Sequence, residues 1–153
     1  MHGRDKFSVF VVDPNAAIRD ALKLLYDAPE VEVSGFEDGA SFIDEAAAHA
    51  HGCLLVENSL PDSSGLALLS KVRKLRNDIP ALLLTSAMNP AHTSLASELG
   101  VTGIVFKPYS SQQLINRIQA LRDLTVEGAV ESSIGGYPLP DTKRSSGALL
   151  SWR

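Results

Sequence analysis

Polar side chains follow four short apolar runs in this sequence. Asp13 follows FSVFVV, Glu57 follows CLLV, Thr85 ends ALLLT, and Lys107 follows GIVF. Strand ends often carry one polar residue, so each of these alone is weak evidence for a site. If all four runs are strands of one parallel sheet, two acids, a hydroxyl and an amine lie on the rim where such sheets bind ligands. The four residues together predict a functional site.

The elements that must position these residues alternate along the chain. Short runs rich in β-branched and aromatic residues are each followed by a segment whose apolar residues recur at helical spacing. The sequence predicts strands over residues 7–12, 31–36, 53–56, 81–85 and 103–106, and helices over residues 16–26, 39–50, 66–75, 91–99 and 112–124. This alternation predicts a parallel sheet covered by helices on both faces, with right-handed crossovers.

The apolar content of each run predicts its place in the sheet. Residues 9–12, 53–56 and 81–84 contain no alternating polar residue, which is typical of central strands buried on both sides. Residues 31–35 read VEVSG and alternate, as expected of a strand at the edge of the sheet.

The overall composition limits the classes of function. The chain has 153 residues and a net charge of −4, with no basic patch of the kind that binds nucleic acid, and no apolar run long enough to span a membrane. We therefore expect a cytoplasmic protein that binds neither nucleic acid nor membrane directly. One domain is predicted over residues 1–124, followed by a Gly, Ser and Pro-containing tail or linker over residues 125–153.

Four motifs at the strand ends resemble one known family. VVDP, LVENSLPDSSG, LLLTSA and GIVFKPYS are similar to the conserved segments of receiver domains of two-component response regulators, over roughly residues 7–124. The resemblance implies an α/β fold that is doubly wound and flavodoxin-like. Its five-stranded parallel sheet would have the order 2-1-3-4-5, with helices on both faces.

The resemblance also implies a phosphoacceptor site. In the family, a histidine kinase's phosphoryl group passes to an aspartate at the end of the third strand, and an acidic pair after the first strand holds Mg²⁺. Glu57 stands at the phosphoacceptor position. Of the acidic pair only Asp13 is present, because Pro14 occupies the second position. Both departures affect the same site.

The remaining family positions are partly retained. Thr85 matches the hydroxyl that follows the phosphoryl group, and Lys107 matches the lysine that pairs with the acceptor carboxylate. Ser59 and Pro108 belong to the same predicted pocket. The aromatic residue that usually stands three positions before the lysine is replaced by Ile104, so the coupling of hydroxyl movement to ring burial lacks its ring.

These substitutions predict weak phosphate chemistry. Glutamate carries its carboxylate about 1.5 Å farther from the backbone than aspartate, which displaces it from the in-line geometry of phosphoryl transfer. Mg²⁺ needs near-octahedral oxygen ligands, and Pro14 supplies no side-chain oxygen. We therefore expect no cofactor, with Mg²⁺ bound weakly if at all. The charge of Glu57 would lie within reach of Lys107 or Thr85 and partly mimic a phosphoryl group.

The sequence thus predicts an atypical receiver, a phosphorylation-independent protein-interaction module in signal transduction rather than an enzyme. Its expected partners are signalling proteins, among them a histidine kinase or another regulator. A homodimer would form through residues 91–124, which hold the last two helices and the strand between them.

Two alternatives remain open at this point. In the first, the protein is a conventional Mg²⁺-dependent receiver, with Asp62 as a substitute acceptor. In the second, it is a small flavodoxin-like enzyme, although the segment DPNAA after the first strand has no glycine-rich phosphate loop.

Overall fold

Five parallel strands form one sheet in the computed structural model, which describes residues 6–134 and the side chains of residues 6–123. The strand order is β2-β1-β3-β4-β5, which confirms the predicted doubly wound topology. The elements are β1 (Phe7–Val12), α1 (Ala16–Tyr26), β2 (Val31–Phe36), α2 (Gly39–Glu45), β3 (Cys53–Glu57), α3 (Gly65–Lys74), β4 (Ala81–Thr85), α4 (Pro90–Glu98), β5 (Gly103–Phe106) and α5 (Ser111–Ile134).

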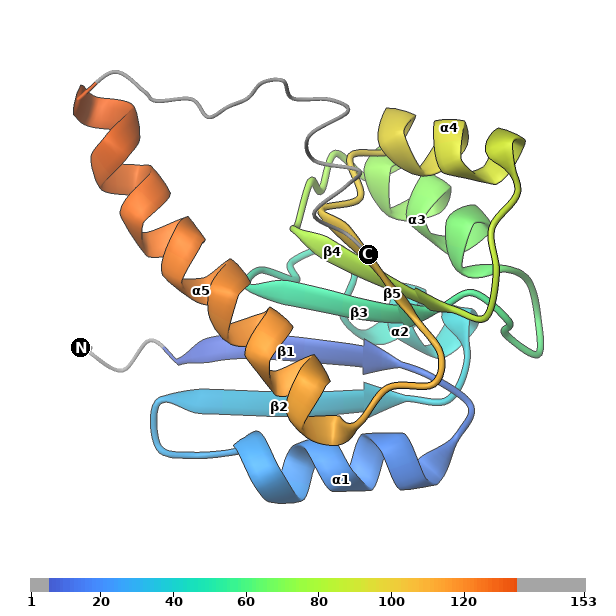
Figure 1. The fold of residues 1–153 in the computed structure, drawn as a ribbon, viewed down its shortest axis with the longest axis horizontal. Coiled ribbons are helices and arrows are strands. Elements are labelled where there is room, and N and C mark those ends of the chain that lie inside the picture. The colour runs from blue at the N-terminus through green and yellow to red at the C-terminus, as the bar shows by residue number, and fades with distance from the viewer. Residues whose placement is uncertain (1–5, 135–153) are drawn as a thin grey trace.

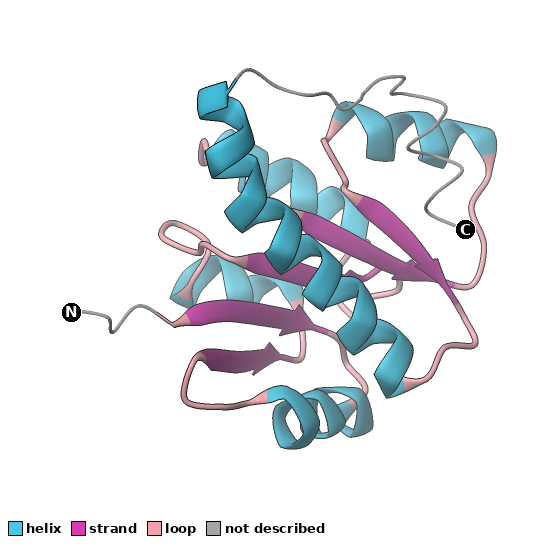
Figure 2. Ribbon diagram, turned by 60° about the vertical axis from the view of Figure 1, so that its left-hand side comes forward, coloured by secondary structure: helices cyan, strands magenta, loops and turns pink. Residues whose placement is uncertain are grey.

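Helices cover both faces of the sheet (Figures 1 and 2). On one face, Leu22 of α1 and Leu114 and Ile118 of α5 pack against Val9 and Leu55 of the central strands. On the other face, α2, α3 and α4 pack against the alternate residues of the same strands. Because successive residues of a strand point to opposite faces, each central strand contributes to both cores.

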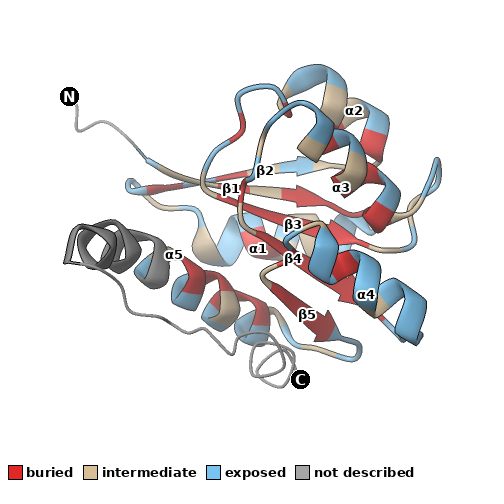
Figure 3. Cartoon of the chain, turned by 90° about the horizontal axis from the view of Figure 1, so that it is seen from above, coloured by how far each residue is buried: buried red, intermediate tan, exposed pale blue. Residues whose placement is uncertain are grey.

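The burial of the strands follows their order in the sheet (Figure 3). Every residue of β3 and β4 is buried, whereas β2, at the edge, alternates between buried and more exposed positions. The prediction that residues 9–12, 53–56 and 81–84 form the central strands is confirmed by the pairing of β3 with both β1 and β4.

Helix α2 is shorter than predicted. It ends at Glu45, and the residues that follow form turns as far as His49. The prediction of a helix to Ala50 was wrong because the side-chain amide of Asn77 captures this segment. Its Nδ2 donates hydrogen bonds to the carbonyls of Ala47 and Ala50, at 2.8 and 2.9 Å. These hydrogen bonds hold the segment in the turns that follow Glu45.

Helix α5 is longer than predicted. It continues past Leu124, where the helix was expected to end, as far as Ile134. The predicted boundary between residues 124 and 125 therefore falls inside a helix, because the glycine and the β-branched residues of this stretch lower helix propensity without forbidding a helix. The rest of the predicted tail, residues 135–153, lies outside the described residues. Within the described part of the chain, no helix combines the length and the apolarity needed to cross a bilayer.

Candidate functional site

The carboxyl ends of β1, β3, β4 and β5 meet at one edge of the sheet (Figure 1). The four polar residues predicted from the sequence lie there. Asp13, Glu57 and Thr85 are only 3%, 3% and 4% exposed, and they are the buried polar or charged residues of the described chain. The Lys107 side chain is 39% exposed. Burying charge is costly unless it is compensated, so the partners of these groups decide what the site can do.

Glu57 uses both of its carboxylate oxygens. Its Oε1 lies 2.7 Å from the Nζ of Lys107, and its Oε2 accepts a hydrogen bond of 2.9 Å from the backbone N–H of Ser59. The sequence placed Glu57 within reach of Lys107 or Thr85, and the structure brings it to Lys107.

The backbone around Glu57 is held closely. A Cβ added to Gly65, the first residue of α3, would lie 2.7 Å from the Glu57 carbonyl oxygen. The N–H of Gly65 donates to the carbonyl of Asn58 at 2.9 Å. Glycine is required here because only it allows the start of α3 to approach the end of β3 so closely. This contact fixes the origin of the Glu57 side chain.

Lys107 is positioned by the end of β5. Its backbone N–H donates to the carbonyl of Thr85 at 2.9 Å, which continues the β4 to β5 ladder beyond the last residue of β5. The peptide bond between Lys107 and Pro108 is cis. From this position the lysine side chain reaches across the end of β4 to Glu57.

Asp13 has a different environment. Its Oδ1 accepts a hydrogen bond of 2.8 Å from the N–H of Asn15, and its backbone carbonyl accepts one from the guanidinium of Arg19. Burial raises the pKa of the Asp13 carboxyl, and the negative charge of Glu57 raises it further. The hydrogen bond from Asn15 and the charges of Lys107 and Arg19 offset this only in part.

Thr85 and Ile104 take no part in the ion pair between Glu57 and Lys107. The Thr85 hydroxyl donates to the carbonyl of Ala87 at 3.0 Å, within its own loop. Ile104 is 3% exposed and belongs to the hydrophobic core that α3 and α4 cover. The Thr85 hydroxyl is therefore on the rim but forms no hydrogen bond with Glu57 in the described part of the chain, and Ile104 lies below the rim, within β5.

Pro14 and Asp62, named for the metal and for the alternative acceptor, also lie apart from the ion pair. Pro14 is exposed and opens the loop into α1. The Asp62 carboxylate accepts hydrogen bonds from the N–H groups of Gly39 and Ala40, at 3.2 and 2.9 Å. Asp62 thus caps the start of α2, where a negative charge is favourable.

The rim offers few ligands for a divalent cation. Among the described residues, no three His, Cys, Asp or Glu side chains gather in a way that could hold a metal ion. Both oxygens of Glu57 already have partners, and Asp13 is the remaining carboxylate. Mg²⁺ takes six oxygens in near-octahedral geometry, and the described side chains offer it only Asp13 and the already paired Glu57.

Comparison with known proteins identifies the fold and its family. A family model described as the response regulator receiver domain matches residues 9–119. The chain belongs to this receiver family. The resemblance seen in the sequence is confirmed, and so is its role in two-component signal transduction, in which the family acts.

Named relatives agree with this assignment. The transcriptional regulatory protein FixJ of Bradyrhizobium diazoefficiens is 27% identical over 115 residues, which cover 75% of this chain and 56% of FixJ. The transcriptional regulatory protein TdiR of Thauera aromatica is 29% identical over 122 residues, which cover 80% of this chain and 54% of TdiR. This receiver thus spans about half the length of these curated relatives.

Solved structures show the same fold. The response regulator StyR superposes with a TM-score of 0.69 at 26% identity, covering 83% of this chain and 64% of StyR. A CheY-like receiver domain protein of Methanospirillum hungatei JF-1 gives a TM-score of 0.72 at 21% identity, covering 81% of this chain and 99% of that protein. Because its sequence identity is only 21%, the structure of the CheY-like protein supports the fold alone.

Sequence reasoning missed two residues of this rim. Arg19 donates to the Asp13 carbonyl. Tyr109 lines the pocket beside Asp13 together with Ile18. Arg19 lies six residues after Asp13, which places it within the first turns of α1 next to the strand end. That spacing could have identified it, whereas the position of Tyr109 depends on the path of the loop after β5.

Proposed function

We propose that this receiver is atypical and acts in signal transduction as a phosphorylation-independent protein-interaction module. The observation that carries the proposal is the double engagement of the Glu57 carboxylate, by the Lys107 ammonium at 2.7 Å and the Ser59 N–H at 2.9 Å. Glu57 stands where the family has its phosphoacceptor. Here this carboxylate is part of an internal ion pair.

The geometry of phosphoryl transfer supports this proposal. The transferred group must lie in line between the attacking and leaving oxygens, and catalysis depends almost entirely on positioning and charge stabilisation. In this chain the Oε1 of Glu57 is paired with the Lys107 ammonium, and the extra methylene moves the carboxylate away from where an aspartate would place it. Elsewhere in the family this lysine pairs with the acceptor aspartate, whereas here Lys107 pairs with the longer Glu57 carboxylate.

The need of phosphoryl transfer for a metal ion also supports the proposal of a phosphorylation-independent receiver. Phosphoryl transfer relies on a divalent cation to neutralise developing charge. Asp13 is the one acid left of the usual pair, and Pro14 has no oxygen to offer. We therefore propose that the receiver functions without Mg²⁺ and has no enzymatic activity of its own. The Glu57 carboxylate supplies one negative charge and two oxygens, which is a partial substitute for a phosphoryl group.

A Mg²⁺ titration tests this part of the proposal. We expect no saturable heat or amide shift when Mg²⁺ is added to the wild-type chain at physiological concentrations. The double variant Pro14→Asp, Glu57→Asp should gain a site with shifts at the β1 and β3 ends, and the single variant Pro14→Asp serves as the intermediate control. Tight Mg²⁺ binding by the wild type would favour the alternative of a conventional phosphoaccepting receiver.

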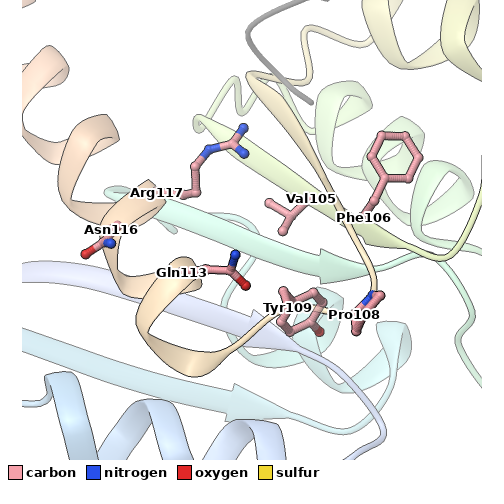
Figure 4. A pocket seen from close by; sticks show the side chains of 7 residues that line it. All are labelled: Val105, Phe106, Pro108, Tyr109, Gln113, Asn116 and Arg117. Carbon is pink, nitrogen blue, oxygen red and sulfur yellow. The ribbon is translucent and has the colours of Figure 1, made fainter.

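The surface formed by α4, β5 and α5 is the proposed interaction face. Leu95 of α4 and Phe106 of β5 are 38% and 36% exposed, so two large apolar side chains reach solvent on this face. Beside Phe106, a pocket of about 320 Å³ lies between β5 and α5, with Val105 among its lining residues (Figure 4). Apolar side chains around a pocket are typical of the anchor points of protein interfaces.

One charge on this face is uncompensated. Arg117 of α5 lines the same pocket, and its guanidinium has no ion pair or hydrogen bond with any side chain that the structure describes. Partial burial lowers the pKa of Arg117. A partner that brings an acidic side chain would regain the electrostatic energy lost by this burial. We propose that signalling partners, a second copy of this chain among them, bind at this face.

The oligomeric state tests the homodimer part of this proposal. In sedimentation velocity experiments at rising concentration, the wild-type chain should associate, and Phe106→Ser should shift the equilibrium toward monomer. Leu75→Ser is the matched control, because Leu75 is also exposed but lies at the end of α3. A monomer at every concentration, or equal effects of the two variants, would contradict a homodimer at this face.

A further inference from the structure

Helix α1 carries apolar side chains on its outer side, which no other described element covers (Figures 1 and 2). Leu24 and Leu25 are 83% and 58% exposed, the largest exposures of any large apolar residue whose side chain the structure describes. Ala17 and Ala21 extend this surface toward the start of the helix at helical spacing. These four residues form the α1 face. Adjacent exposed apolar side chains on one side of a helix indicate a contact surface.

Negative charge borders the α1 face. Three exposed acids lie beside it: Asp20, one turn before Leu24, and Asp27 and Glu30, which follow the helix. None of the three forms an ion pair with a side chain that the structure describes. A segment that covers the two leucines and also brings basic residues would therefore match this surface in both polarity and charge.

The two cations of α1 are bound to other parts of the fold. The Nζ of Lys23 donates to the backbone carbonyl of Val33 in β2 at 2.9 Å. The guanidinium of Arg19 donates to the backbone carbonyl of Asp13 at the end of β1. Neither cation is paired with the acids beside the α1 face, so these acids remain available to a basic segment.

The sequence of the tail, residues 135–153, has the complementary pattern. Residues 148–152 read ALLSW, with Arg153 directly after this apolar run and Lys143-Arg144 shortly before it, whereas Asp141 is the one acid of the tail. The exposed apolar side chain of Phe106 is a poorer match, because it lies beside cations: Lys107 follows it, and Arg117 lines its pocket. Charge therefore favours the α1 face for this segment.

The length of the tail permits this contact within one chain. Helix α5 passes α1 where the Tyr26 hydroxyl donates to the Gln119 side chain at 3.2 Å. From there α5 continues to Ile134, about 22 Å farther at 1.5 Å per residue. Residues 135–147 span up to about 43 Å when extended, so residues 148–152 can return to Leu24 and Leu25. A tether of this kind raises the effective concentration of the segment at the α1 face.

We propose that the tail docks on the α1 face of its own chain. Residues 148–152 cover Leu24 and Leu25, and the basic residues on either side of this run lie beside the acids of α1. In this arrangement the α1 face is accessible to another protein only while the tail is released. The inference does not rest on the proposed function, because α1 packs at the β2 edge of the sheet and the interaction face lies at the opposite edge, β5 (Figure 1).

Tryptophan fluorescence of the full chain tests this inference, because Trp152 is the single tryptophan and lies in the docking segment. The wild type should emit at shorter wavelength than N-acetyltryptophanamide and should be quenched less by acrylamide, at every protein concentration. Leu24→Ser should raise the acrylamide quenching constant by about twofold or more, because the apolar contact is lost. Leu75→Ser is the matched control and should leave it unchanged, since Leu75 is 46% exposed but lies at the end of α3.

Charge reversal provides an independent variant that keeps both leucines. The double variant Asp20→Lys, Glu30→Lys should also raise the quenching constant, because the basic residues of the tail then face positive charge. Asp27 is left unchanged because its Oδ1 accepts the N–H of Val33 at 3.0 Å. Adding Lys143→Glu and Arg144→Glu to the double variant should return the quenching constant toward that of the wild type, which damage to the fold would not do.

Several results would overturn the inference. One is quenching of the wild type as strong as that of N-acetyltryptophanamide, and another is an equal effect of Leu24→Ser and Leu75→Ser. A larger effect of Phe106→Ser would place the tail on the interaction face instead. Protection of Trp152 that appears only at high protein concentration would mean that the tail binds a second copy, which also contradicts docking within one chain.

Discussion

At the scale of single residues, the site depends on how three buried or half-buried charged groups compensate one another. Glu57 is paired with Lys107, whose side chain is 39% exposed, and Asp13 has only partial compensation from its neighbours. A buried ion pair contributes little net stability, but removal of one partner leaves the other uncompensated. Replacement of Glu57 by a neutral residue should therefore lower the free energy of unfolding, whereas neutral replacement of Asp13 should raise it.

Glu57→Gln should lower the free energy of unfolding by about 1 to 2 kcal/mol at pH 7. The amide keeps the hydrogen bond from Ser59 but loses the charge that holds the Lys107 ammonium. The loss stays moderate because the half-exposed lysine can turn to water. Urea unfolding measures it, with Glu98→Gln on the exposed surface of α4 as the control. Equal stability of the wild type and Glu57→Gln would show that the ion pair contributes nothing.

Asp13→Asn should raise the free energy of unfolding at pH 7. The folded-state pKa of Asp13 lies above its ordinary value of 3.8, mainly because of burial. The ionised carboxylate thus costs stability at every pH above the folded-state pKa, and this cost disappears as the pH falls below 3.8. Asparagine retains the acceptor for the N–H of Asn15.

The pH dependence provides the measurement for Asp13. The stability advantage of Asp13→Asn in urea unfolding should be largest at pH 7 and should shrink steadily as the pH falls toward 3.8. Asp20→Asn, which is exposed, should show no such trend. An advantage that grows on acidification would mean that the folded state favours the charged form of Asp13.

The sequence predicted where these side chains originate but not all of what they contact. Asp13, Glu57 and Lys107 follow apolar strand runs, and parallel strands bring their carboxyl ends to one rim. The partners depend on side-chain rotamers and loop paths, which spacing does not determine. Thr85 shows this limit, since its hydroxyl binds the carbonyl of Ala87 in its own loop and not the carboxylate beside it.

At the scale of elements, the structure differs from the sequence-based predictions at loops and at the ends of helices. Asn77, in the loop between α3 and β4, donates to the carbonyls of Ala47 and Ala50 and accepts the N–H of Ile79 at 3.0 Å. One side chain thereby connects the end of α2 to the start of β4. Sequence patterns cannot predict a contact of this kind because the partners are about 30 residues apart.

Asn77→Ala should lower the free energy of unfolding by about 2 to 3 kcal/mol. The substitution leaves the carbonyls of Ala47 and Ala50, both buried residues, without their donor. Thermal and urea unfolding measure the loss, and Asn116→Ala on the exposed face of α5 is the control. A loss no larger than that of the control would mean that water replaces the amide at no cost.

Helical periodicity predicted the existence of α1 but placed one residue on the wrong face. Leu25 follows Ile18 and Leu22 at helical spacing, yet it is 58% exposed. Tyr26 packs there together with Ile18 and Leu22, and its hydroxyl donates to the Gln119 side chain of α5 at 3.2 Å. Leu25 and Tyr26 are adjacent on the helix, so periodicity alone does not choose between them. The contact with α5 places Tyr26, and not Leu25, against the core.

At the scale of the whole molecule, the fold was the part most fully predicted. Five alternations of strand and helix, with right-handed crossovers, allow few arrangements, and the burial pattern of the strands identified the central ones. The resulting rim keeps the architecture of a receiver, and we propose that Glu57 and Pro14 change the chemistry it can perform. The central claim is that this rim no longer accepts a phosphoryl group.

The most direct test of that claim is the intact mass of the full chain after incubation with acetyl phosphate and Mg²⁺. The wild type should gain no phosphoryl adduct, and the double variant Pro14→Asp, Glu57→Asp should gain one. This outcome would establish a receiver whose pocket is intact apart from its acceptor and metal ligand. A phosphoryl adduct on the wild-type chain would contradict the account, and peptide mapping would then identify the accepting residue.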